Sequence, residues 1–166
     1  MKPETTKERI MAAHELPESL DGLIAPTQRA RDGAHERIRT LIADDSPACR
    51  RVAGLLLAKL PKVQIVGAAE DGVDALALVA TTRPDLVLMD QQMPRLDGLQ
   101  ATRRIRAEFP AVRVIVTTFS GSEKWKAAST ASGVDWFIPK DCLPKELPGV
   151  IAEMFSGPGG AAKGER

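Results

Sequence analysis

Residues 85–98, with the sequence Asp-Leu-Val-Leu-Met-Asp-Gln-Gln-Met-Pro-Arg-Leu-Asp-Gly, decide the fold of this chain. The first part is mostly apolar and ends on a carboxylate, Asp90. A short apolar run bounded by turn signals is typical of a strand buried on both faces, as in a parallel sheet. The loop that follows contains Pro94 and leads to Asp97-Gly98, where we expect a helix to begin. Because chemistry in open parallel sheets collects at the carboxyl ends of the strands, Asp90 is a candidate functional residue.

Four further apolar runs alternate with segments of helical pattern on either side of this stretch. Strands that alternate with helices form right-handed βαβ units, which build a parallel sheet covered by helices on both faces. The sequence therefore predicts an α/β domain. The expected strands are 40–43, 63–69, 85–90, 112–118 and 135–138, and the expected helices are 47–60, one that follows Asp71-Gly72, 99–109, 122–132 and 144–155.

Capping signals and spacing predict how the first two helices begin and pack. Ser46-Pro47 combines an N-cap residue with proline at the first helical position. Apolar residues at helical spacing predict the face that packs on the sheet. That face is Val52, Leu55, Leu56 and Leu60 in the first helix, and Ala75, Leu76, Val79 and Ala80 in the second.

Length, composition and charge bound the possible functions. A chain of 166 residues with 43% hydrophobic residues fits one domain with tails, and we expect a flexible extension at 1–37, a domain at 38–156 and a flexible tail at 157–166. A helix of the extension that docks on the domain is the open alternative.

The net charge of +1 gives no electrostatic case for binding nucleic acid or membrane, and no apolar run is long enough to span a bilayer. With no secretory signal and two distant cysteines, Cys49 and Cys142, the expected location is the cytoplasm, with both thiols reduced.

Polar side chains end four of the expected strands. Asp44 and Asp45 follow the first strand, Asp90 ends the third, Thr118 ends the fourth and Lys140 follows the fifth. In a parallel sheet these ends share one edge, so we expect the side chains to converge. Three carboxylates there repel one another, and Mg²⁺ relieves the repulsion while leaving room for a phosphate oxygen. A lysine and a threonine can serve other phosphate oxygens, so the sequence predicts a site for a phosphoryl group.

Each of these residues has a plainer explanation when it is taken alone. An aspartate at a strand end is usually a turn former or a helix cap, and Asp44 or Asp45 could cap the helix that begins at Pro47. Thr118 alone is unremarkable, and Lys140 alone would be a solvated surface charge. Their convergence on one edge favours the functional interpretation.

Four sequence blocks carry a family resemblance: Leu-Ile-Ala-Asp44-Asp45-Ser-Pro, Leu-Val-Leu-Met-Asp90-x-x-Met-Pro-x-x-Asp97-Gly98, Val-Ile-Val-Thr-Thr118 and Phe-Ile-Pro-Lys140. In order and spacing they resemble the signature of the receiver domain of two-component response regulators. The resemblance covers about residues 39–155. It implies a flavodoxin-like (βα)5 fold whose parallel five-stranded sheet has the order 2-1-3-4-5. It also implies a phosphorylated signalling switch, not an enzyme acting on other substrates.

The resemblance also assigns roles around the metal. Asp90 would accept a phosphoryl group from a phosphohistidine of a sensor histidine kinase or a phosphotransfer protein. Asp45 and Asp90 would ligate Mg²⁺ directly, and Asp44 would do so through water. The backbone carbonyl of Gln92 would be a further ligand.

Thr118 would hydrogen-bond the phosphoryl oxygen, Lys140 would pair with it, and Phe137 would be the switch aromatic that turns inward on activation. Two of the departures from the family pattern concern the residues that directly follow Thr118 and Lys140. Bulky Phe119 stands where a small residue is usual and could narrow access to Asp90. Asp141 stands where the family usually has proline.

The expected function is a single-domain response regulator that signals by binding an unidentified downstream protein when phosphorylated. The alternative is a DNA-binding transcriptional regulator that lacks its helix-turn-helix output domain, because too few residues follow the last helix to form one. An aspartyl-phosphate phosphatase is disfavoured because Gln92 replaces the second carboxylate of an Asp-x-Asp motif. Phosphotransfer through His14 or His35 is disfavoured because the sequence shows no ATP-binding domain. A homodimer through the face of the fourth and fifth helices stays open.

Overall fold

The computed structural model describes Leu20, Ile24 and the ranges 37–119 and 131–156. The strands are β1 (Ile38–Ala43), β2 (Val63–Ala69), β3 (Leu86–Asp90), β4 (Arg113–Thr118) and β5 (Trp136–Pro139). The helices are α2 (Pro47–Ala58), α3 (Gly72–Thr82), α4 (Gly98–Glu108) and α6 (Leu143–Phe155). All five strands pair in parallel in the order β2-β1-β3-β4-β5, which confirms the predicted sheet.

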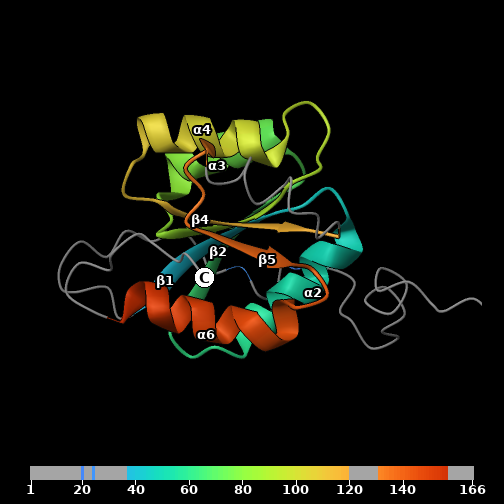
Figure 1. Cartoon of the computed structure of the whole chain (residues 1–166), viewed down its shortest axis with the longest axis vertical. Helices are drawn as coiled ribbons and strands as arrows, with labels where there is room; N and C mark the ends of the chain where they lie inside the picture. The colour runs from blue at the N-terminus through green and yellow to red at the C-terminus, as the bar shows by residue number, and fades with distance from the viewer. Residues whose placement is uncertain (1–19, 21–23, 25–36, 120–130, 157–166) are drawn as a thin grey trace, which may run out of the picture.

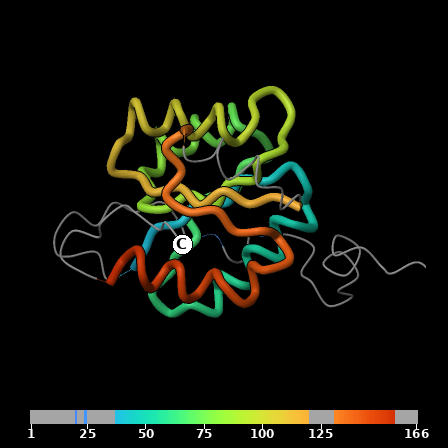
Figure 2. Tube along the Cα trace, viewed as in Figure 1, coloured from blue at the N-terminus to red at the C-terminus, as the bar shows by residue number. Residues whose placement is uncertain are grey.

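The described residues form three layers, with the sheet between the pair α3 and α4 and the pair α2 and α6 (Figure 1). Helices α3 and α4 cover one face, and α2 and α6 cover the other. Figure 2 shows the last helix, drawn in orange to red, running beneath the sheet beside α2. Because the helices pair in this way, the helix layers close two separate cores on opposite faces of the sheet.

Alternate side chains of the central strand supply the two cores. All five residues of β3 are buried. Leu86 and Leu88 join the core under α2 and α6, whereas Val87 and Met89 join the core under α3 and α4. A slip of one residue would exchange the two sets, so this burial fixes the register and, with it, the position of Asp90.

The predicted face of the first helix is confirmed only in part, because Leu56 and Leu60 pack against the core but are not fully buried. The sheet-facing residues of α2 are Cys49, Ala53 and Leu57. Apolar residues occupy most turns of α2, so their spacing fits more than one stripe, and the small side chains of Cys49 and Ala53 permit the closer approach to the sheet. The predicted residues Val52, Leu55, Leu56 and Leu60 are all only partly buried.

The second helix follows its prediction in part. Ala75 and Val79 of α3 are buried as expected, and Leu76 is partly buried, but Ala80 is exposed. The predicted helix at 122–132 lies almost entirely outside the described residues. Within the described parts of the chain, no helix combines the length and apolar character needed to cross a membrane.

Candidate functional site

Three carboxylates meet at the carboxyl edge of the sheet. Asp44 and Asp45 follow β1 and Asp90 ends β3, and each offers an oxygen that lies within 4.8 Å of the others. Asp44 and Asp90 are buried, with 6% and 5% of their surface exposed, while Asp45 is exposed. The strand ends therefore bring together the acidic residues in the way that the sequence predicted.

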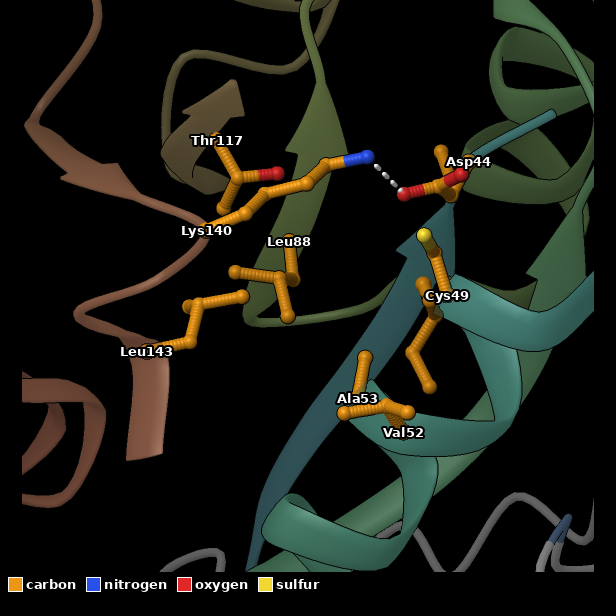
Figure 3. A pocket seen from close by; sticks show the side chains of 10 residues that line it. Asp44, Cys49, Val52, Ala53, Leu88, Thr117, Lys140 and Leu143 are labelled. Carbon is orange, nitrogen blue, oxygen red and sulfur yellow. Dashed lines mark hydrogen bonds and ion pairs between the residues drawn. The ribbon is translucent and has the colours of Figure 1, made fainter. Parts of the chain in front are cut away.

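Lys140 reaches the same place from the end of β5. Its Nζ lies 2.6 Å from Oδ2 of Asp44 and 3.0 Å from Oδ1 of Asp90. Figure 3 shows the lysine side chain extended towards Asp44, with a dashed line between them. The backbone N–H of Lys140 donates to the carbonyl of Thr118 at 2.8 Å, which fixes the end of β5 against the end of β4. The ammonium group is thus a buried counter-charge for two carboxylates.

Burial and charge shift the ionisation of these groups. Burial raises the pKa of Asp90 from 3.8 to about 6, and the Asp44 carboxylate adds to this rise, which Lys140 opposes. Burial likewise raises the pKa of Asp44 above its usual value, although Lys140 opposes it. For Lys140, burial favours the neutral amine, but Asp44 and Asp90 outweigh burial and raise its pKa. The lysine therefore stays charged while the two buried carboxylates are costly to ionise together.

The loop after Asp90 is held at both ends. The N–H of Gln91 donates to the carbonyl of Thr117 at 2.9 Å, and the N–H of Gly98 donates back to the carbonyl of Gln91 at 2.9 Å. Asp97 caps α4 by accepting from the N–H of Gln100 at 2.8 Å. A Cβ atom on Gly98 would collide with the carbonyl oxygen of Asp90, so only glycine permits this approach.

A second contact ties this loop to α3. Arg95, which has a positive φ of 63°, donates through Nε to Oδ2 of Asp71 at 2.6 Å and through its terminal nitrogen to the same oxygen. Asp71 also caps α3, and the N–H of Asp74 and the Arg95 guanidinium together lower the pKa of Asp71. Sequence reasoning missed Arg95, because no spacing rule pairs a loop arginine with a cap 24 residues away.

The remaining predicted residues surround this centre. Thr118 is buried at the end of β4, and Gln92 is exposed in the loop after Asp90. Phe119 is 39% exposed, and its ring centroid lies 4.7 Å from Nζ of Lys140. Phe137 of β5 is partly buried against the core under α3 and α4. The ring of Phe119 thus lies over the ammonium group that pairs with Asp90.

A small pocket of about 20 Å³ lies beside Lys140 and Asp44. Cys49 of α2 and Thr117 of β4 contribute to its wall, and Figure 3 shows the Cys49 sulfur on the same side as the carboxylate of Asp44. Burial raises the pKa of Cys49, so this thiol is a packing residue at neutral pH and not a nucleophile. The sequence predicts Thr117 at the end of the fourth strand, on this edge of the sheet, but it does not predict Cys49 near the site. The helical spacing of Cys49 with Ala53 and Leu57 was the available signal.

The donor set fits a hard divalent cation. Carboxylate oxygens at this spacing, two buried and one exposed, match the preference of Mg²⁺ for a few carboxylates completed by water. Burial and the neighbouring Asp44 carboxylate raise the pKa of Asp90 even with Lys140 present, so a further positive charge would favour the ionised form. A cation beside Asp44, Asp45 and Asp90 would supply that charge.

The family model that matches this chain is the response regulator receiver domain, and it matches residues 40–152. The chain belongs to this family. The receiver-domain match begins within β1 and ends within α6, so it takes in every residue of the acidic site.

Two curated relatives match this chain over part of their own length. The chain is 48% identical over 84 residues to protein-glutamate methylesterase/protein-glutamine glutaminase 4 of Myxococcus xanthus, covering 51% of this chain and 24% of the relative. It is 32% identical over 122 residues to the uncharacterized transcriptional regulatory protein YxjL of Bacillus subtilis, covering 74% of this chain and 56% of the relative. The chain thus spans about a quarter to just over half of these relatives.

Among solved structures, the signal receiver domain of the putative response regulator NarL from Mycobacterium tuberculosis is similar, with a TM-score of 0.69 and 28% identity. The match covers 74% of this chain and 99% of that one. The shared part is therefore a whole receiver domain.

Proposed function

We propose that this receiver domain accepts a phosphoryl group on Asp90 and signals through the conformational change that follows. The observation that carries the proposal is the pair of contacts from the buried Lys140 ammonium to Asp44 and to Asp90. A buried lysine between two strand-end carboxylates supports a site that must handle changing negative charge.

In the proposed reaction, a carboxylate oxygen of Asp90 attacks the phosphorus of a phosphohistidine on the donor. The P–N bond breaks, a P–O bond forms, and the donor imidazole takes up a proton, so no redox partner is needed. Asp90 must be ionised to attack, and its pKa of about 6 leaves most of it ionised at neutral pH. Lys140 is close enough to move from Asp90 to a phosphoryl oxygen, and Thr118 would donate to another.

Asp44, Asp45 and Asp90 would hold Mg²⁺, with the backbone carbonyl of Gln92 as a further ligand. The cation would neutralise negative charge on the transferring group and orient its oxygens. The chain's own part is to fix the carboxylates at the ends of β1 and β3, and the bonds of Gln91 and Gly98 hold the loop that contains Gln92.

Phosphorylation would change the charge balance around Lys140. The new oxygens would draw Lys140 and Thr118 together, and Phe137 of the neighbouring strand would respond by moving inward. The output would be binding of a downstream protein in a cytoplasmic pathway, with a sensor histidine kinase or phosphotransfer protein as the donor. The chain matches part of a methylesterase/glutaminase and part of a transcriptional regulatory protein, which supports a receiver whose output is separate from its own chemistry.

Incubation with a small-molecule phosphodonor and Mg²⁺ tests the proposal. Intact-mass measurement should show one added phosphoryl group, and peptide mapping after borohydride reduction should place it on Asp90. Asp90→Asn should abolish labelling, whereas Glu153→Gln, an exposed acidic residue of α6, should label normally. Asp45→Asn should raise the Mg²⁺ concentration required. Persistent labelling of Asp90→Asn, or labelling that needs no divalent cation, would overturn the proposal.

A further inference from the structure

The two described residues of the N-terminal stretch lie against the edge of the sheet. Ile24 forms a parallel bridge with Ile65 of β2, which is an edge strand in this sheet. Leu20 is 7% exposed and belongs to the core under α2 and α6. Both residues precede the range 40–152 that defines the receiver family. This contact is therefore an addition to the domain that the family shares.

Leu20 and Ile24 act as one unit. The N–H of Ile24 donates to the carbonyl of Leu20 at 3.1 Å, which fixes the two residues relative to each other. Ile24 is itself partly buried against the core that contains Leu20. One residue thus enters the core while the other extends the sheet, so the contact combines apolar burial with strand pairing.

The site they occupy is one that an isolated domain would leave open. Ile65 pairs on its inner side with Thr40 of β1, and the register shifts immediately afterwards, as at a β-bulge. The outer side of an edge strand presents unpaired N–H and C=O groups that can pair with another chain. Ile65 is only 3% exposed, and its cover on the outer side includes Ile24.

We propose that Leu20 and Ile24 form a strap by which this chain closes its own β2 edge. The occupants of the edge are these two residues of the same molecule, and the fit is apolar. The strap affects where another chain can pair with the sheet, because β2 and β5 are the two outer strands of the described sheet. With β2 covered at Ile65, pairing with a partner chain is favoured at β5.

Point variants of the full chain test whether the strap is part of the fold. Leu20→Ala should lower the folding equilibrium constant by about 30-fold, which is about 2 kcal/mol at roughly 1.4 kcal/mol per tenfold. Val73→Ala is the matched control, because Val73 is apolar but 44% exposed, and it should change the constant by less than about twofold. Urea denaturation followed by far-UV circular dichroism measures both. Equal effects of the two variants would overturn the proposal.

Hydrogen exchange tests the location of the strap. Ile24→Asp should speed amide exchange in β2 far more than in β4, a strand with neighbours on both sides. Unchanged exchange in β2 would show that Ile24 does not cover this edge in solution. Protection of β2 should also be independent of protein concentration. Protection that rises with concentration would place the segment of a second copy on the edge and overturn the assignment within one molecule.

Discussion

Replacing the proposed phosphoacceptor should stabilise the metal-free protein at neutral pH. Asp90 is buried, and its pKa is raised from 3.8 to about 6, chiefly by burial and then by Asp44. The folded state therefore binds the proton of Asp90 more tightly than the unfolded state does. Stability falls as the pH rises from about 4 to about 6, because folding above this range requires an ionised carboxylate in a buried site.

The size of the stability change follows from the pKa shift of Asp90. At roughly 1.4 kcal/mol per pKa unit, the change from 3.8 to about 6 corresponds to about 3 kcal/mol of lost stability above pH 6. Asp90→Asn removes the charge and retains an oxygen that can accept from Lys140. The variant should thus be more stable than the parent by up to about 3 kcal/mol at pH 7.5, and the pH-dependent part of this gain should vanish near pH 4.

Urea unfolding in EDTA, followed by far-UV circular dichroism between pH 4 and 7.5, measures the difference. Glu153→Gln provides the control, because it removes one negative charge from an exposed position on α6 and should change stability by less than about 0.5 kcal/mol. Adding Mg²⁺ should stabilise the parent more than Asp90→Asn and so narrow the gap. A difference in stability between Asp90→Asn and the parent that is absent at pH 7.5, or equally large at pH 4, would refute the reasoning that Asp90 carries a costly buried charge.

Three further substitutions probe the site and the fold that supports it. Gly98→Ala should destabilise the protein by about 1–3 kcal/mol through the collision with the Asp90 carbonyl, whereas Gly149→Ala, which has open space, should not; thermal unfolding compares them. Phe119→Ala should speed phosphorylation by a small donor several-fold, because the ring lies over Lys140, and an unchanged rate would show that the ring leaves the donor's path clear. Arg106→Met should cost about 2 kcal/mol in urea unfolding, since it removes donors to Asp135 and to the carbonyls of Gly133, Pro110 and Val112; a loss below about 0.5 kcal/mol would contradict this.

The fold was predictable because its signals are local. Each apolar run is flanked by residues that end a strand or begin a helix, and the parallel sheet follows from their alternation. The buried face of α2 was not predictable in the same way. Several apolar stripes fit its sequence, and only the sheet surface opposite decides that Cys49 and Ala53 are buried while Val52 and Leu56 are only partly buried.

In the candidate site, too, the positions of residues at strand ends were predictable, but the contacts between side chains from distant parts of the sequence were not. Strand ends placed Asp44, Asp90 and Lys140 on one edge, but the sequence assigned Lys140 only to a phosphoryl group. Its ion pair with Asp44 joins residues 96 positions apart, and it depends on side-chain reach that no spacing rule contains. The contact of Arg95 with Asp71 and the burial of Leu20 likewise depend on side chains that meet only in the folded chain, so no spacing rule predicts them.

These contacts also indicate where a signal can leave the site. The loop after Asp90 is fixed by the bonds of Gln91 and Gly98 and by Arg95, so it has little freedom to move when Asp90 changes charge. Lys140 is different, because its contacts with Asp44 and Asp90 depend on that charge. Lys140 follows β5, and its backbone N–H bonds to the end of β4. A change at Asp90 should therefore pass to β4 and β5 before it reaches α4.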